Sequence, residues 1–211
     1  MSLNNRFITI EGTEGAGKST AMNCLKDWFQ SRAVTPIITR EPGGTPLSEE
    51  IRSLLLAHRE EAVAPKTELL LMYASRVQLT EGTIKPALAN GEWVISDRYN
   101  DASFAYQGVG RALGVELLQT LDDWSLEGFK PGHTLFLDLP VDIGMKRAGQ
   151  RGELDRFERE DIEFFERVRQ GYLQRAEADP ERFIVINAAL SIENVKQQII
   201  AALDERLSSE F

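Results

Sequence analysis

The sequence predicts an α/β fold in which a five-stranded parallel sheet is flanked by helices on both faces. Three observations predict this fold. Short strand-like runs alternate with helical patterns, the runs are almost continuously apolar, and a glycine-rich turn joins the first run to the first helix. A chain of 211 residues fits one domain, residues 1–211, with a small mobile lid at about 147–161.

The expected strands are apolar nearly throughout, as strands buried on both faces should be. They are residues 6–11, 35–40, 92–97, 133–139 and 182–187. Apolar residues at helical spacing predict helices that begin near Lys18, Leu47, Thr67, Val115, Val141, Asp161 and Ile192. The stretch 68–80 is apolar nearly all round, so we expect a buried helix there. Mixed charges and two glycines make 147–161 typical of an exposed segment.

The composition is ordinary for a globular protein, but the charge excludes some partners. The formal net charge is -9 and the pI is about 4.9, and no basic stripe of the kind that binds a nucleic-acid duplex is present. The one cysteine, Cys24, excludes an internal disulfide and favours a reducing compartment. No run resembles a signal segment or approaches the roughly 20 apolar residues of a membrane span. We therefore expect a cytoplasmic protein that binds neither nucleic acid nor membrane.

A phosphate-binding loop follows the first expected strand. Residues 12–19, GTEGAGKS, fit the pattern G-x-x-x-x-G-K-[ST], in which backbone N–H groups and the start of a helix surround a phosphate. We expect Lys18 to reach the β- and γ-phosphates and Ser19 to bind Mg²⁺. An ordinary glycine-rich turn would need neither side chain. The expected ATP-binding residues here are Gly12, Thr13, Glu14, Gly15, Ala16, Gly17, Lys18, Ser19 and Thr20.

Two classes of phosphate-loop protein fit the rest of the sequence poorly. A GTPase should carry N-K-x-D after a strand, whereas the late strands here end in LDLP and VINAA. A motor ATPase should carry an acidic pair after its hydrophobic strand, whereas Arg98 follows Asp97 in WVISDRY. We expect Asp97 to hold Mg²⁺, directly or through water.

Four further stretches carry a family resemblance. They are TREPGGTPLSEEIRSLL (39–55), LLLMYASR (69–76), SDRYNDASFAYQG (96–108) and RGELDR (151–156). Together with EGTEGAGKST, they resemble bacterial thymidylate kinases over almost the full chain. The resemblance implies a P-loop kinase fold that moves the γ-phosphoryl group of ATP onto dTMP with Mg²⁺, usually as a homodimer. The alternatives are another P-loop nucleoside monophosphate kinase, or a nucleotide-binding switch without transferase activity.

The resemblance assigns the charged residues around the phosphates. Arg98 would lie between the donor and acceptor phosphates, although a structural ion pair with Asp97 is the alternative. Arg52 would reach the acceptor phosphate, although it would otherwise lie on a solvated helix face. Arg40 and Glu41 would support the site, and Glu41 is expected to add to the Mg²⁺ shell.

The resemblance also assigns the residues that would bind dTMP. Arg76 would donate to the thymine ring, and Met72 stands where the family commonly has a stacking Phe. Ser103 and Gln107 would approach the base, and Tyr106 would lie against the sugar where a 2′-hydroxyl would be. Tyr73, beside Met72, is expected to pack in the core. Glu14 would accept a hydrogen bond from the deoxyribose 3′-hydroxyl, which explains an acid inside a phosphate loop.

The last cation is expected from the lid. The loop at 12–19 carries no arginine, and the bacterial type takes one from the lid, where Arg147, Arg151 and Arg156 are available. We choose Arg151 as the catalytic residue, together with Lys18 and Arg98. Arg147 is expected near the adenine, where the loop at 187–188 would contribute backbone contacts. A solvated charged helix is the alternative for any one of these lid arginines.

Overall fold

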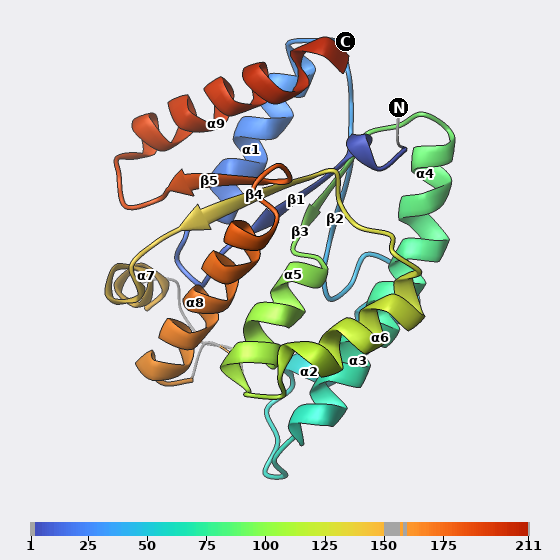
Figure 1. The fold of residues 1–211 in the computed structure, drawn as a ribbon, viewed down its shortest axis with the longest axis vertical. Helices are drawn as coiled ribbons and strands as arrows, with labels where there is room; N and C mark the ends of the chain where they lie inside the picture. The colour runs from blue at the N-terminus through green and yellow to red at the C-terminus, as the bar shows by residue number, and fades with distance from the viewer. Residues whose placement is uncertain (1–2, 150–156, 158–159, 211) are drawn as a thin grey trace.

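The computed structural model describes residues 3–149, 157 and 160–210, and its centre is a five-stranded parallel sheet (Figure 1). The strand order is β2-β3-β1-β4-β5, and every neighbouring pair is parallel. The strands are β1 (Phe7–Glu11), β2 (Ile37–Arg40), β3 (Val94–Asp97), β4 (His133–Asp138) and β5 (Phe183–Asn187). The prediction of five parallel strands is confirmed, with ends that differ by one or two residues.

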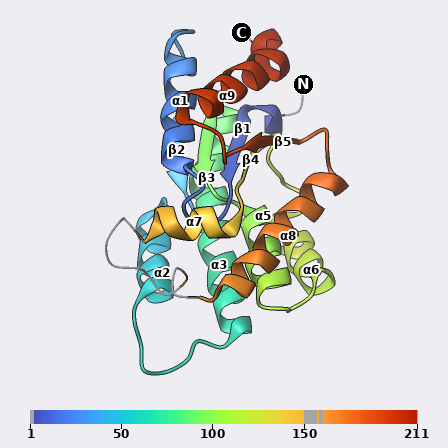
Figure 2. The ribbon, with the colours of Figure 1, turned by 90° about the vertical axis from the view of Figure 1, so that its left-hand side faces the viewer.

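Helices cover both faces of the sheet, which also confirms the prediction (Figures 1 and 2). All seven expected helices are present, and the short helices α4 and α5 were not predicted. The helices are α1 (Lys18–Gln30), α2 (Pro46–Leu56), α3 (Pro65–Leu79), α4 (Lys85–Ala89), α5 (Asn100–Ser103), α6 (Val115–Leu126), α7 (Val141–Ala148), α8 (Ile162–Ala178) and α9 (Ile192–Leu207). In the part of the chain that the structure describes, no helix is both long and apolar enough to cross a membrane.

Alternate residues of the central strands contribute to apolar cores on the two faces of the sheet. Ile8 and Ile10 of β1 pack with α1 and α9 on one face, where Leu25 and Ile199 are fully buried. Phe7 points to the other face and packs with residues of α3, α4 and α6. Because both faces are covered by apolar side chains, all five residues of β1 are buried. This removes the polar–apolar alternation from the strands and explains their continuous apolar pattern.

Helix α3 differs from the expectation that it would be buried all round. Leu69, Tyr73 and Leu79 face the core, but Leu70 is 60% exposed. The helix packs against α2 and α6, and Figure 2 shows it between α2 and α5. Packing within this chain therefore does not account for the exposed apolar residues of α3.

Two stretches of helix are wound more widely than an α-helix. Thr80–Ile84 (η2) joins α3 to α4, and Phe104–Gly110 (η3) continues α5. In η3 the Arg111 N–H donates to Tyr106 O at 2.8 Å, five residues back, which is the hydrogen bond of a π-helix. The sequence ASFAYQGVG has neither a clear 3.6-residue apolar period nor a good stop signal, so this helical turn was not predicted. Residues 3–6 (η1) and 208–210 (η4) form short 3₁₀ turns.

Candidate active site

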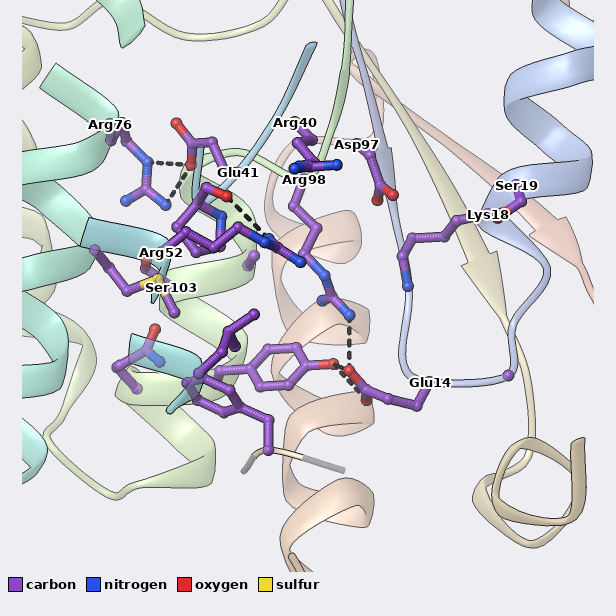
Figure 3. Close-up of a pocket in the computed structure, with 18 of the residues that line it drawn as sticks. Glu14, Lys18, Ser19, Arg40, Glu41, Arg52, Arg76, Asp97, Arg98 and Ser103 are labelled. Atoms are coloured by element: carbon purple, nitrogen blue, oxygen red, sulfur yellow. Dashed lines mark hydrogen bonds and ion pairs between the residues drawn. The ribbon is translucent and has the colours of Figure 1, made fainter. Parts of the chain in front are cut away.

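A cavity of about 330 Å³ opens beyond the carboxyl ends of β1, β2 and β3 (Figure 3). This edge of a parallel sheet is where α/β proteins bind ligands. Figure 3 shows Arg98 between Lys18 and Glu14 on one side and Arg52, Arg76 and Ser103 on the other. The charged residues lining the cavity are Lys18, Arg40, Arg52, Arg76 and Arg98 against Glu14, Glu41 and Asp97. The excess of cations suits a ligand that carries several negative charges.

The loop between β1 and α1 has the backbone that its sequence predicts. Gly15 and Gly17 have φ of 75° and 95°, which favours glycine, and α1 begins at Lys18. The Lys18 ammonium group donates to the carbonyl oxygens of Gly12 and Thr13 at 3.3 and 3.4 Å. Burial, and then the charge of Arg98, lower the pKa of Lys18. The Lys18 ammonium group is therefore held by two carbonyl oxygens of the loop, where the motif binds a phosphate.

The loop lies directly against α7. A Cβ added to Gly15 would overlap the carbonyl group of Gly144, so only glycine fits there. Of the expected ATP-binding set, Glu14, Gly15, Gly17, Lys18 and Ser19 line the cavity, and Gly12, Thr13, Ala16, Thr20 and Arg147 do not. Thr13 and Ala16 are buried under the loop, 4% and 3% exposed. The side chains of Thr13 and Ala16 therefore pack inside the protein and do not face the cavity.

Glu14 is bound by two residues from the other side of the cavity. Arg98 Nη2 donates to Glu14 Oε1 at 2.9 Å, and the Tyr106 hydroxyl lies 2.7 and 2.9 Å from the two carboxylate oxygens. The Arg98 guanidinium also lies over the Tyr106 ring, 4.7 Å from its centroid. The acid therefore belongs to a network that joins the phosphate loop to η3. The structure does not contain the alternative ion pair between Arg98 and Asp97. Among the described residues, the carboxylate paired with Arg98 is that of Glu14.

Arg98 has a left-handed backbone, with φ of 72°. This conformation is strained for a residue with a Cβ and persists only where the surroundings enforce it. Here the Arg98 N–H donates to Ile10 O at 3.0 Å, and the Ser96 hydroxyl donates to Arg98 O at 2.7 Å. Both bonds tie the residue to the central strands. The guanidinium is thereby fixed at the edge of the sheet, where Arg98 Nη1 also donates to the Tyr172 hydroxyl at 3.2 Å.

Glu11, at the end of β1, is fully buried behind Arg98. Its oxygens accept hydrogen bonds of 2.7 Å from the Tyr99 N–H and from the Tyr172 hydroxyl. Burial, reinforced by the charge of Asp101, raises the pKa of Glu11 from 4.5 to about 8. The side chain therefore carries a proton at neutral pH and holds Tyr172 against Arg98. It does not line the cavity.

Arg76 and Glu41 form a buried ion pair at the far end of the cavity. Arg76, 1% exposed, donates from Nε and Nη2 to Glu41 Oε2 at 2.8 Å and from Nη2 to Tyr99 O at 3.0 Å. Within the described residues, Arg76 Nη1 and Glu41 Oε1 are buried without a partner. Burial raises the pKa of Glu41 to about 7, although Arg76 opposes the shift. Arg76 Nη1 is thus a donor that a ligand could satisfy.

The remaining residues expected to bind the acceptor also line the cavity. They are Arg52, Met72, Ser103, Tyr106 and Gln107. Arg52 donates to Pro42 O at 2.9 Å, which folds it back from the solvated helix face that was its alternative. The Gln107 amide donates to Glu68 Oε1 at 2.9 Å. Tyr73 instead packs in the core, as expected, and its hydroxyl donates to the partly buried Asp122.

The metal-binding expectation is supported most directly at Asp97. Asp97 Oδ1 is buried without a partner in the described part of the chain, and Asp97 and Ser19 line the same cavity. No cluster of three or more His, Cys, Asp or Glu side chains is found among the described residues. Mg²⁺ at nucleotide sites uses one or two protein ligands, water and phosphate oxygens, so Ser19 and Asp97 fit it. Glu41 could join only through Oε1, since Arg76 holds Oε2.

Only part of the expected lid, residues 147–161, lies within the described residues. Arg147 Nη1 donates to Ala188 O at 3.0 Å, which brings together the two parts of the chain that were expected near adenine. Arg151 and Arg156 lie outside the described residues, as does most of the expected lid at 147–161.

The structure adds cavity residues that the sequence did not indicate. Leu56, Ala102 and Phe157 line the cavity, and Phe157 makes an edge contact with Tyr106, with the centroids 6.3 Å apart. Phe157 is the one aromatic residue in the charged stretch RGELDRFERED, which is a signal that could have identified it. Leu56 and Ala102 look like ordinary helix residues, and only the fold brings them here.

Comparison with known proteins gives one consistent result. The family model for thymidylate kinase matches residues 10–199. Curated relatives named thymidylate kinase include those of Vibrio parahaemolyticus (52% identical, covering 97% of this chain and 98% of the relative) and Teredinibacter turnerae (50% identical, covering 96% and 98%). A relative with the same name from Pseudomonas putida is 51% identical, covering 93% of this chain and 94% of the relative.

Proposed function

Because this chain belongs to the thymidylate kinase family, and so transfers the γ-phosphoryl group of ATP to dTMP, we propose that the cavity beside the phosphate loop receives dTMP. The observation that carries this assignment is the position of Glu14. A carboxylate within a phosphate loop would repel a donor nucleotide, but here it faces a second compartment lined by Arg52, Arg76 and Arg98. An acid on that side can accept a hydrogen bond from the 3′-hydroxyl of a deoxyribose.

Phosphoryl transfer requires positioning and charge neutralisation more than covalent chemistry. The backbone N–H groups of residues 12–20 and the Lys18 ammonium hold the β- and γ-phosphates of ATP. Arg98 lies between the donor loop and the acceptor compartment and neutralises charge on the phosphoryl group in transit. Ser19 and Asp97 would hold Mg²⁺, with Glu41 Oε1 further out, and the ion supplies positive charge at the phosphates. We propose Lys18, Arg98 and Arg151 as the catalytic residues.

The acceptor compartment fits a nucleotide with its phosphate toward Arg98. Arg52 and Arg98 bind the acceptor phosphate, and Glu14 and Tyr106 contact the sugar. Tyr106 is 5% exposed and packed against Phe157, so it cannot move aside for a 2′-hydroxyl without disturbing the core. This supports selection for deoxyribose.

The base lies at the opposite end of the cavity. Arg76 Nη1 donates to the thymine ring, Ser103 and Gln107 approach its edge, and Met72 covers its face with a polarisable thioether. The thymine methyl group itself adds only about 0.8 kcal/mol of burial. Selection against dUMP by this methyl alone is therefore modest.

The remaining proposals concern the lid, the assembly and the compartment. Residues 1–211 act as one domain, in which the lid at 147–161 brings Arg151 to the phosphates and Arg147 to the adenine. Closure only over both substrates would keep ATP from water. The single free cysteine, Cys24, supports a location in the cytoplasm.

We further propose a homodimer that uses helices α2, α3 and α6. These helices pack side by side and carry exposed apolar residues: Leu47, Leu54, Leu70, Val115, Leu117 and Trp124. Trp124 is 78% exposed, which is unusual for so large an apolar side chain outside an interface. Analytical ultracentrifugation at micromolar concentration should give a dimer, and a monomer would contradict this proposal.

A coupled ADP-release assay tests the function. With ATP and Mg²⁺ present, dTMP should support turnover well above CMP or AMP, with dUMP intermediate. Turnover with CMP or AMP but not dTMP would indicate another nucleoside monophosphate kinase. ATP binding without acceptor-dependent turnover would indicate a nucleotide switch, which has no use for the acceptor-side arginines. The Arg98→Ala variant should bind ATP and lose most of the dTMP-dependent rate.

A further inference from the structure

Glu68 is a fully buried acid beside the base end of the cavity. It lies in the first turn of α3 with 0% of its surface exposed, and it does not line the cavity. Gln107 Nε2 donates to Glu68 Oε1 at 2.9 Å. Arg111 Nε and Nη2 donate to Glu68 Oε1 and Oε2, at 3.3 Å each. A buried carboxylate is costly unless it is paired and hydrogen-bonded, and this one is bound to Gln107 of η3 and to Arg111, the residue that follows η3.

The chemistry of Glu68 fixes the orientation of the Gln107 amide. A carboxylate accepts hydrogen bonds and has none to donate, so the amide nitrogen must be the atom that faces it. The amide oxygen of Gln107 then lies on the other side of the amide group. Gln107 lines the cavity, so this oxygen is the atom available there to a ligand. Because the two ends of an amide have nearly the same size, sterics alone would not select this orientation.

Arg111 keeps the carboxylate in place. Its guanidinium also pairs with Glu160, with Arg111 Nη2 lying 2.6 Å from Glu160 Oε1. The guanidinium stands over the Phe164 ring, 4.7 Å from the ring centroid. Glu68 is therefore held through both of its oxygens, one of which it shares with Gln107. Its oxygen presents a fixed acceptor to the amide nitrogen.

We propose that Glu68 is a positioning residue that sets the base specificity of the cavity by holding the Gln107 oxygen toward the ligand. Arg76 Nη1 is a donor and Gln107 Oε1 is an acceptor at the same end of the cavity. Thymine and uracil present the complement, a carbonyl oxygen at C4 and an N–H at N3. Cytosine presents an amino group and a bare nitrogen, so both contacts would be mismatched. A site built to hydrogen-bond one pattern leaves buried groups unpaired with the other.

This inference rests on the proposed place of the base and makes Glu68 more than a structural link between α3 and η3. A structural link would affect all acceptors alike. A positioning role affects only those that differ at N3 and C4. The pair dTMP and dUMP share that edge, whereas dTMP and dCMP do not.

The test measures kcat/KM of the full-length Glu68→Gln variant with dTMP, dUMP and dCMP at saturating ATP. A glutamine can donate or accept, so the Gln107 amide becomes free to turn. The dTMP:dCMP ratio of kcat/KM should fall by about tenfold or more, since one mismatched buried hydrogen bond is worth 1–3 kcal/mol. The dTMP:dUMP ratio and the KM for ATP should remain within about twofold of the wild type. An unchanged dTMP:dCMP ratio, or an equal fall in both ratios, would overturn the proposal.

Three further variants make the outcome decisive. Asp204→Asn is the matched control, because Asp204 also accepts from one neutral N–H, that of Trp28, and from one arginine, Arg32, but far from the cavity. It should leave every ratio unchanged. Glu68→Asp keeps an acceptor-only side chain, so it should retain more of the dTMP:dCMP ratio than Glu68→Gln, and it serves if the glutamine variant fails to fold. An aspartate variant with no more selectivity than the glutamine variant would count against positioning.

Gln107→Leu separates this inference from the proposed function. It should lower kcat/KM for dTMP if the base lies against Gln107. If it does not, the base lies elsewhere and the assignment of the cavity fails. If it does, while Glu68→Gln keeps wild-type selectivity, only the positioning role of Glu68 fails.

Discussion

The protonated state of Glu11 gives the most quantitative prediction. Burial raises the pKa of Glu11 from 4.5 to about 8, so the folded protein holds a proton there that the unfolded chain releases above about pH 4.5. For an acid with a raised pKa, the stabilising contribution is complete below the unfolded pKa and is lost as pH rises through the folded value. Between pH 6 and pH 9 the loss spans about two pKa units. At about 1.36 kcal/mol per unit, it amounts to ~3 kcal/mol.

The Glu11→Gln variant should not show this loss. An amide oxygen can still accept from the Tyr99 N–H, and the amide stays neutral at every pH used. Urea denaturation of both proteins without nucleotides, at pH 6 and pH 9, measures the difference. The wild type should lose ~3 kcal/mol more than the variant, about 6–12 °C in Tm for a chain of this size. Groups common to both, such as Glu41, cancel in the comparison. Equal losses in the two proteins would refute the assignment of a buried, protonated Glu11.

Two further predictions concern the phosphate loop. Glu14→Gln should raise the KM for dTMP roughly 10- to 150-fold and leave ATP affinity unchanged, because a hydrogen bond to a charged acceptor is worth about 1.5–3 kcal/mol. Steady-state kinetics and ATP titration measure the two quantities, and a change in ATP affinity alone would contradict the prediction. Gly15→Ala should weaken ATP binding in calorimetric titration far more than Gly17→Ala, because both glycines have positive φ but only at Gly15 would a Cβ overlap the Gly144 backbone. Equal weakening would mean that backbone strain, rather than the close approach to α7, sets the requirement for glycine.

The sequence predicted the sheet, the phosphate loop and the main helices because each leaves a local pattern. Strands buried on both faces read as apolar runs, and the loop has a fixed spacing of glycines before Lys18. The other residues around the cavity were accessible through the resemblance of four stretches, 39–55, 69–76, 96–108 and 151–156, to a known family. The expectation that α3 is buried all round was wrong, because the sequence alone does not distinguish the exposed Leu70 from the buried Leu69.

Other site features depend on contacts between distant parts of the chain. Glu68 and Arg111 are 43 residues apart, and neither stands out in its own segment. Glu11 and Tyr172 are 161 residues apart, so the proton on Glu11 follows only from the burial that the complete fold creates. A sequence pattern can suggest that an acid is structural. Its ionisation state requires knowledge of what surrounds it.

The π-helical segment η3, Phe104–Gly110, has a consequence for how this chain can vary in length. Tyr106 and Gln107 of this segment both line the cavity, and Arg111 lies just beyond it. A π-turn holds one residue more than an α-helical turn, so a segment shortened by one residue could rewind to an α-helix and would lose the hydrogen bond from the Arg111 N–H to Tyr106 O. Six of the seven residues of the segment are buried, so neither its length nor most of its side chains can change without disturbing this wall of the cavity.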